Sequence, residues 1–342
     1  MKTSLRSLHV LTILILFCFS HRLFAQSDNQ PLSLVKQGEL LHSQGKYDES
    51  IAKFTEALKA DPEDAAANYG IAFTLYSAKR PLEGIPYLEK VVKSPHPGLV
   101  VGAYSLMGSI YDENHQSPKA IEMFNQVIKL APNYPQAYYN LGLAYSRNQQ
   151  YAEAETAAIE AIKREPKSAG IQRLYALAAF HQNKRMNALM AFCSFLLIEP
   201  SGPRAAEALN NIQSILKGGV LKDAGGNIPK TDPETNALNT DIQKITAAAP
   251  AKKLQGTDLL EYELKTIITT EGQSAEKKTS KSFFDNFFAQ YLYKLSQSDN
   301  MPAFLHIVSI AANKDEYTRW AGENQQKVDG LKDWVKNTER NF

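Results

Sequence analysis

Cysteine is scarce in this sequence, with two residues in a chain of 342. Cys18 lies in an N-terminal apolar run, and Cys193 follows Phe192 in a helical pattern. If the N-terminal run is removed, a single thiol remains, which excludes a disulfide framework. The fold must therefore be held by its hydrophobic core, and we expect Cys193 to be a buried structural thiol.

Charge of one sign is not in excess, because 38 basic residues stand against 36 acidic ones. A near-neutral chain has no general attraction to nucleic acids or anionic membranes. We therefore expect no nucleic-acid partner. Long apolar runs are missing after the N-terminus, so we expect no integral membrane span in the processed chain.

Motifs for catalysis or metal binding are also missing. The seven histidines are scattered, and none pairs with another histidine or a cysteine at metal-ligand spacing. The sequence has no phosphate-binding glycine loop and no nucleophile motif. Neighbouring carboxylates such as Glu261 and Glu263 are expected to lie on solvated helix faces. These absences predict a protein that is not an enzyme and that holds no metal and no cofactor.

Residues 1–25 have the pattern of a secretory signal peptide. A basic start precedes an apolar run from Val10 to Phe19, and Ala25 is a small residue at the expected cleavage point. We expect Sec-type export to a periplasm or the extracellular space. An uncleaved anchor or a lipid on Cys18 are the alternatives. Cleavage changes the net charge from +2 to −1, because it removes no acid and three basic residues, Lys2, Arg6 and Arg22.

The strongest pattern is an internal repeat, in which a small residue stands three places before a larger one in the first four units and before Ala179 in the fifth. These small residues lie 34, 36, 34 and 34 places apart: Gly38, Ala72, Gly108, Gly142 and Ala176. Twelve places after each comes a second small residue: Ser50, Gly84, Ala120, Ala154 and Ala188. Four units close at a proline: Pro62, Pro132, Pro166 and Pro200. The longer interval puts two extra residues, most simply, within Ser94–Leu99 and predicts a wider turn there.

Each unit is predicted to be a pair of helices. The small residues let a neighbouring helix approach closely, and a large residue such as Phe54 or Phe124 fills the gap beside them. Proline ends the second helix, because it cannot continue one. A helix pair cannot bury its apolar face alone, so neighbouring pairs must stack.

This pattern resembles the tetratricopeptide repeat. The best match lies at 138–166, with Tyr138, Leu141, Gly142, Tyr145, Tyr151, Ala154, Ala161 and Pro166. The resemblance implies an all-α fold, a right-handed α-solenoid of about five helix pairs. The predicted repeats are 31–64, 65–98, 101–134, 135–168 and 169–202, of which the second and the fifth match less well.

The rest of the chain is predicted to be helical with one interruption. Residues 203–217 read as a cap helix that ends the solenoid domain, 26–217. Glycine and proline mark 218–253 as a linker with room for one short helix at 234–248. Residues 254–342 then predict a small helical C-terminal domain of four helices. Its aromatic residues between Phe283 and Tyr291 are expected to form core.

The resemblance also implies a partner-binding groove, lined by the first helix of each repeat. Transferred onto this sequence, the inward positions with the strongest binding potential are Tyr69, Phe73, Tyr76, Tyr139, Leu143, Arg173 and Phe180, and Asn140 and Arg147 lie one helical step beside them. Aromatic residues and arginine are frequent anchors at interfaces. We expect an apolar protein segment or peptide to lie there, oriented by a carboxylate on an arginine.

Three hypotheses about function follow. The first is an exported scaffold that binds protein or peptide partners in its groove, in envelope assembly or secretion. The second is that the repeats only position the C-terminal domain, which binds a ligand or is an unrecognised enzyme. The third is self-assembly into homo-oligomers through the ends of the solenoid.

Overall fold

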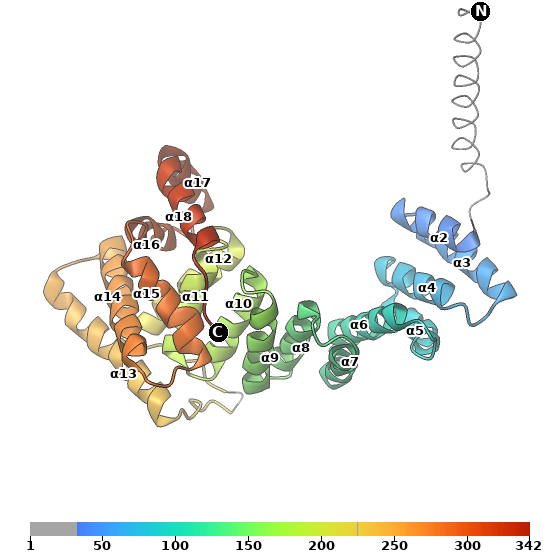
Figure 1. The fold of residues 1–342 in the computed structure, drawn as a ribbon, viewed down its shortest axis with the longest axis horizontal. Coiled ribbons are helices and arrows are strands. Elements are labelled where there is room, and N and C mark those ends of the chain that lie inside the picture. Colours follow the sequence, from blue (N-terminus) through green and yellow to red (C-terminus); the bar gives the residue numbers. More distant parts are fainter. Residues whose placement is uncertain (1–32, 224) are drawn as a thin grey trace, which may run out of the picture. The chain divides into compact units, whose positions relative to one another are not determined.

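The computed structural model describes residues 33–223 and 225–342, so the predicted signal peptide at 1–25 lies outside the described residues. Within the described part the chain forms seventeen α-helices and no strand (Figure 1). The predicted all-α fold is confirmed. In this part of the chain no helix combines the length and the apolar character that crossing a bilayer requires.

The chain divides into two compact units, and the division falls within helix α6 (Pro97–Glu113). The first unit ends at Ala103, and the second runs from Tyr104 to Phe342. This division differs from the predicted one, which placed a linker between the repeats and the C-terminal segment. The physical reason is that the last repeats and the C-terminal segment share one core, as described below.

The first unit contains two helix pairs. They are α2 (Leu34–Ser43) with α3 (Tyr47–Ala60), and α4 (Ala65–Ser77) with the 3-10 turn η1 (Pro81–Gly84) and α5 (Ile85–Val91). The Ser33 side chain caps α2 by accepting a hydrogen bond from the backbone amide of Lys36, and Asp64 caps α4 in the same way. These caps fix where the first helix of each pair begins.

The second helix of the second pair is short and irregular. Pro81 opens η1, and Pro86 lies in the first turn of α5, which has seven residues where α3 has fourteen. Proline is tolerated only in the first turn of a helix, so two prolines five places apart divide this helix. The chain then turns before α6, which begins at Pro97 within the segment predicted to hold the extra residues.

Glycine and a buried aromatic ring set the distance between helices in the first unit. A Cβ atom built on Gly38 would lie 2.8 Å from the Phe54 ring, and one built on Gly70 would lie 2.5 Å from it. Real Cβ atoms essentially never approach so closely, so both positions require a residue without a side chain. The Phe54 ring therefore fills the space that two glycines on neighbouring helices leave open.

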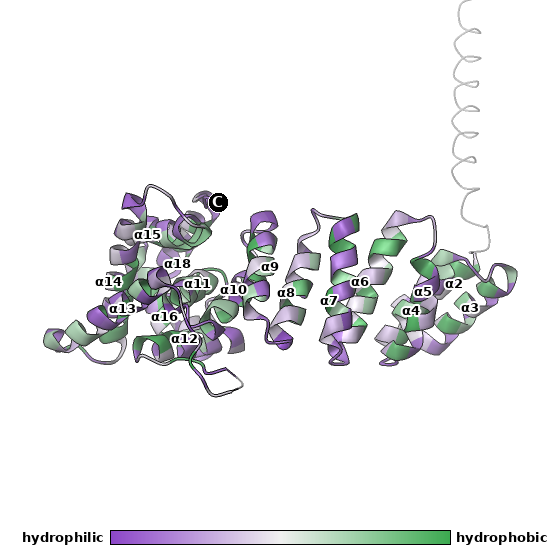
Figure 2. Ribbon diagram, turned by 90° about the horizontal axis from the view of Figure 1, so that it is seen from below, coloured by the Kyte–Doolittle hydropathy of each residue, from purple (hydrophilic) through white to green (hydrophobic). Residues whose placement is uncertain are grey.

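The second unit continues the repeats with the same logic. Its repeat helices are α7 (Ser117–Leu130), α8 (Pro135–Arg147), α9 (Tyr151–Arg164), α10 (Ala169–His181) and α11 (Arg185–Leu196). In α7 hydrophobic and hydrophilic residues alternate along the helix, and Phe124 is among the buried ones (Figure 2). A Cβ atom on Gly108 would lie 2.6 Å from the Phe124 ring, and one on Gly142 would lie 2.7 Å from Leu174. Gly108 and Gly142 thus lie at seams between helices, as the repeat predicted.

The turn inside each helix pair uses the left-handed backbone conformation once. The residues concerned are Gly45, Lys79, His115, Gln149 and Asn183, with φ between +57° and +76°. They recur at the same intervals as the small residues of the repeat. Only the first is glycine, so the other four hold a conformation that L-residues rarely adopt.

The C-terminal helices pack on the last repeats. They are α12 (Pro203–Leu216), α13 (Pro233–Ala248), the 3-10 turn η2 (Ala249–Lys252), α14 (Gly256–Lys277), the π-helical turn η3 (Asp285–Ala289), α15 (Gln290–Ser296), α16 (Met301–Ser309), α17 (Lys314–Glu323) and α18 (Gln325–Asn337). Helix α13 lies within the segment predicted as a linker, at the place where the sequence left room for one short helix. Eleven of the twelve residues of α11 are buried, and one hydrophobic cluster runs from Ala158 to Leu331.

The aromatic stripe predicted as core is core. Phe287, Phe288 and Tyr291 are buried, and the Phe288 ring stacks on Tyr175 of α10 with 4.8 Å between centroids. Cys193 is also fully buried, and burial raises the pKa of its thiol to about 12. Its thiolate is therefore not formed at neutral pH, which agrees with a structural residue.

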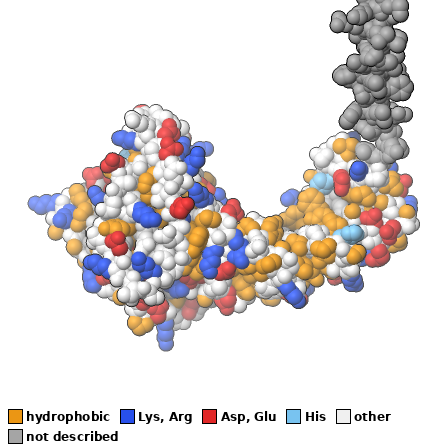
Figure 3. Space-filling view, in the orientation of Figure 1, with side chains coloured by type: hydrophobic (Ala, Val, Ile, Leu, Met, Phe, Trp, Pro, Cys, Tyr) orange, Lys and Arg blue, Asp and Glu red, His pale blue; other side chains and the backbone are white. Residues whose placement is uncertain are grey.

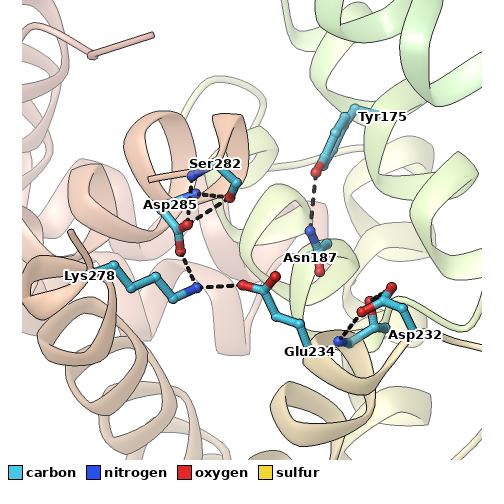
Figure 4. Close-up of polar contacts among 8 residues, drawn as sticks. Tyr175, Asn187, Asp232, Glu234, Lys278, Ser282 and Asp285 are labelled. Atoms are coloured by element: carbon cyan, nitrogen blue, oxygen red, sulfur yellow. Dashed lines mark hydrogen bonds and ion pairs between the residues drawn. The ribbon is translucent and has the colours of Figure 1, made fainter. Parts of the chain in front are cut away.

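A buried carboxyl group, Glu271 of α14, lies in an acidic neighbourhood. It is 3% exposed, and its Oε1 atom has no hydrogen-bond partner among the described residues. Nearby, the Lys278 ammonium bridges Glu234 and Asp285 at 2.8 Å from each carboxylate (Figure 4). Burial raises the pKa of Glu271 to about 7; Lys278 opposes the rise, and the neighbouring carboxylates add to it.

We predict that Gly108→Ala lowers the free energy of unfolding by about 1–3 kcal/mol, because the buried Phe124 ring must move to admit the methyl group. The higher helix propensity of alanine offsets about 1 kcal/mol of that loss. Gly98→Ala is the matched control on the same helix, since nothing lies within 4 Å of its Cβ position. Urea unfolding of both variants checks this, and equal stability of the two would contradict it.

We also predict that Glu271 makes stability depend on pH. Its folded pKa of about 7 exceeds the ordinary value of 4.5, so the folded state keeps a proton that the unfolded state releases. The stability that this group contributes is fully present below the unfolded-state pKa of 4.5, and it is lost as the pH rises through the folded-state pKa of about 7. Glu271→Gln should exceed the wild type by about 1–3 kcal/mol at pH 8 and match it at pH 5. Urea titrations at the two pH values measure the difference in stability between the variant and the wild type. A difference that does not change with pH would contradict the prediction.

Candidate partner-binding surfaces

The first unit carries a row of contacting rings, which we call the aromatic strip: Tyr47, His42, Phe73 and Tyr69. The Phe73 ring stacks on His42 with 4.9 Å between centroids and lies nearly parallel to Tyr69 at 6.2 Å. Tyr47 closes the row at 5.5 Å from His42. Phe73 is 42% exposed in spite of these contacts. Figure 3 shows hydrophobic side chains, with histidine among them, at the surface of this unit.

The His42 ring is held by a hydrogen bond that also fixes its tautomer. The Thr74 hydroxyl donates its hydrogen to the Gly70 carbonyl at 2.7 Å, so it can only accept from His42 Nδ1 at 3.0 Å. Nδ1 of the neutral ring therefore carries the hydrogen, and Nε2 is an acceptor. The strip thus combines apolar ring faces with one polar atom in a defined orientation.

The predicted tyrosines of the first unit are less exposed than Phe73. Tyr69 and Tyr76 are both half-buried on α4. A Cβ atom on Gly102 would lie 3.2 Å from the Tyr69 ring, so this ring also packs on α6. Phe73 is the member of the predicted set in this unit with the greatest exposure, and Tyr69 supports it from the side.

The predicted residues of the second unit lie on α8 and α10. Tyr139, Asn140 and Leu143 are half-buried, and the Asn140 side-chain oxygen accepts a hydrogen bond of 2.7 Å from Gln136. Tyr139 and Leu143 pack against the edge of the large core cluster. The C-terminal helices cover α11 and leave these side chains partly open to solvent.

The two predicted arginines are already paired within the chain. Arg147 forms an ion pair with Asp112 of α6, and Arg173 forms one with Glu207 of α12. A partner carboxylate would have to displace these internal carboxylates. We predicted that an arginine of the groove binds a partner carboxylate. This prediction is corrected for both residues, because each arginine already binds a carboxylate of the chain itself.

Phe180 is a further correction to the predicted set. It is 2% exposed and meets the Phe192 ring edge-to-face, with 6.5 Å between centroids. Its side chain thus belongs to the contact between α10 and α11. It has no surface to offer to a partner.

Sequence reasoning missed a cavity among the C-terminal helices. It has a volume of about 480 Å³ and is lined mainly by polar side chains from α14, α16, α17 and α18 and the turn before α16: Glu261, Asp299, Asn300, His306, Trp320 and Lys327. His306 lies 4.8 Å from the Trp320 ring between centroids and 3.6 Å from the Glu261 carboxylate. These residues are up to 66 places apart, so no local motif announced them.

A second, larger cavity of about 710 Å³ opens beside the turn between α8 and α9. Tyr151 and His181 line it as a stacked pair, with 4.1 Å between ring centroids. Burial lowers the pKa of His181, so its ring is held in the neutral form around pH 7. The other wall is the loop before α13, with Lys222 and Lys230.

Comparison with known proteins gives the family of the repeat region. Family models described as TPR repeat and tetratricopeptide repeat match residues 38–78, 108–149 and 135–168. The protein O-mannosyl-transferase Tmtc3 of Drosophila melanogaster is 27% identical over 119 residues. That alignment covers 34% of this chain and 12% of the fly protein, so the chain spans a small part of that relative.

Similar solved structures cover about half of the chain. The crystal structure of MamA is 26% identical, with a TM-score of 0.44, and the match covers 47% of this chain and 94% of that one. YrrB, described as a TPR protein with an unusual peptide-binding site, is 17% identical with a TM-score of 0.44 and coverages of 53% and 92%. MamA from Desulfovibrio magneticus RS-1 is 18% identical with a TM-score of 0.45 and coverages of 49% and 96%. On the family models and the helix pairs together, residues 38–78 and 108–168 of this chain consist of tetratricopeptide repeats.

Proposed function

We propose that this chain is a scaffold that binds a protein or peptide partner, and that the aromatic strip of the first unit is a contact surface. The observation that carries the proposal is the exposure of Phe73 between two stacked neighbours. A partner that covers this ring gains hydrophobic burial. Because His42 and Tyr69 already hold the ring in place, little side-chain entropy is lost on binding.

The chemistry of the strip describes its partner. Ring faces in a row fit an apolar segment, either extended or helical, that lies across α2 and α4. His42 Nε2 can accept one hydrogen bond from an amide or hydroxyl of that segment. The strip contains no arginine, so it does not depend on a partner carboxylate.

The proposed setting is outside the cytoplasm, in envelope assembly or secretion. It rests on the basic start, apolar run and small residue of positions 1–25. An oxidising compartment does not conflict with this free thiol, because Cys193 is buried.

A second candidate function is the binding of a small polar ligand in the cavity beside Trp320. Asp299 and Lys327 line it, and neither makes an ion pair or hydrogen bond through its side chain within the described chain. A planar ring with unpaired groups of both signs suits a ligand with a flat or apolar face and opposite charges, such as an amino acid.

We predict that Phe73→Ala reduces partner recovery at least fivefold, because about 1 kcal/mol or more of ring burial is lost. The experiment is affinity capture with the mature chain, followed by quantitative mass spectrometry. Leu130→Ala is the matched control, since Leu130 is 49% exposed on α7, outside the strip. It should leave recovery unchanged. If neither Phe73→Ala nor Tyr69→Ala reduces partner recovery, the strip is not a contact surface for the partner.

The second candidate predicts that ligand binding changes the fluorescence of Trp320. The chain has two tryptophans, so Trp334→Phe leaves Trp320 as the single reporter. Titration with a panel of amino acids should give a saturable change, and Asp299→Asn should weaken it about tenfold by removing the charge that faces the ammonium group. If no amino acid in the panel changes the signal, this candidate fails.

A further inference from the structure

The segment after α18, residues 338–342, returns to the repeats; we call it the tail. Arg340 Nη1 donates a hydrogen bond of 2.7 Å to Ser194 Oγ on α11. The same guanidinium lies 3.6 Å from the centroid of the Tyr291 ring and 4.7 Å from that of Phe287. The Phe342 ring stacks on Phe287 at 5.5 Å. We call the site formed by Ser194, Phe287 and Tyr291 the arginine cleft.

Ser194 is arranged to receive a donor. Its hydroxyl donates its only hydrogen to the Gln172 side-chain oxygen at 2.7 Å, and Gln172 in turn donates to the Pro166 carbonyl at 2.6 Å. The Ser194 oxygen can therefore only accept hydrogen bonds from a group in the cleft. With two electron-rich ring faces beside it, the cleft matches a planar cation that donates hydrogen bonds, which is a guanidinium.

The contacts that hold the tail are few for a segment that buries the Arg340 cation. Among the described residues no carboxylate pairs with Arg340, and burial lowers the pKa of its guanidinium to about 10. One hydrogen bond and two ring contacts must therefore offset the loss of hydration. Phe342 remains 54% exposed, so it adds little burial. A segment held in this way can leave its site.

We propose that the arginine cleft is a recognition site for a partner segment with arginine and, two residues later, an aromatic residue. The chain's own tail displays the required chemistry and occupies the cleft when no partner is present. A partner that presents the same pair of residues displaces the tail. This surface lies in the second unit and is independent of the aromatic strip.

Competition with the tail has a measurable consequence. If the tail fills the cleft for 90–99% of the time, the affinity for a partner segment falls about 10- to 100-fold. Weakening the tail should therefore tighten binding of a peptide in trans. If weakening the tail creates no such site, the peptide should bind neither the wild type nor the variants.

The test uses a fluorescein-labelled peptide with the sequence of residues 336–342 and measures anisotropy with the full chain. Arg340→Ala should bind this peptide at least tenfold more tightly than the wild type. Lys336→Ala, at the end of α18 and outside the cleft, should bind like the wild type. A peptide with lysine in place of the arginine should lose the binding, because an ammonium cannot stack on two rings in the same way.

Second variants keep the test decisive. Arg340→Lys retains the charge and the aliphatic stem, and it should show the same tighter binding even if Arg340→Ala proves poorly folded by circular dichroism. Adding Ser194→Ala to either variant should abolish the gain. The proposal is overturned if neither Arg340 variant binds the peptide, or if the lysine peptide binds them equally well.

Discussion

The whole repeat region depends on one contact, a buried ring lying against a residue without a side chain. Phe54 sits against Gly38 and Gly70, where a Cβ atom would come within 2.8 Å or less of the ring, and Phe124 sits against Gly108 in the same way. These contacts fix how closely the helices approach, within a pair at Gly38 and Gly108 and between neighbouring pairs at Gly70. They also fix which face of α4 stays outside, so the exposure of Phe73 follows from the same packing that buries Phe54.

Local pattern was enough to predict the helices of the repeats, and it failed where the answer lies in distant contacts. The left-handed residues keep the repeat period, but Lys79 and Gln149 are residue types that rarely mark such a turn. Phe180 was predicted to face a partner. It is buried because Phe192 of the next helix reaches it, and spacing along one helix does not show this.

The candidate site was predicted as a set of positions, and the structure sorts that set by what each side chain already contacts. Arg147 and Arg173 lie at the predicted positions, but they form ion pairs with Asp112 and Glu207, each about one repeat away in sequence. For the C-terminal segment a signal was present: α11 is apolar on every side, and such a helix must be covered all round. That pattern indicates a shared core rather than a solenoid face in solvent.

The two units thus manage their binding groups differently. In the first, Thr74 and Tyr69 support the aromatic strip while the Phe73 ring stays 42% exposed, so a partner adds contacts without breaking any. In the second, Arg147, Arg173 and Arg340 are each engaged by the chain itself, so a partner must exchange one contact for another. Replacing an internal contact lowers the affinity for a partner. It also gives selectivity, because only a partner segment with matching chemistry can replace the internal contact that is broken.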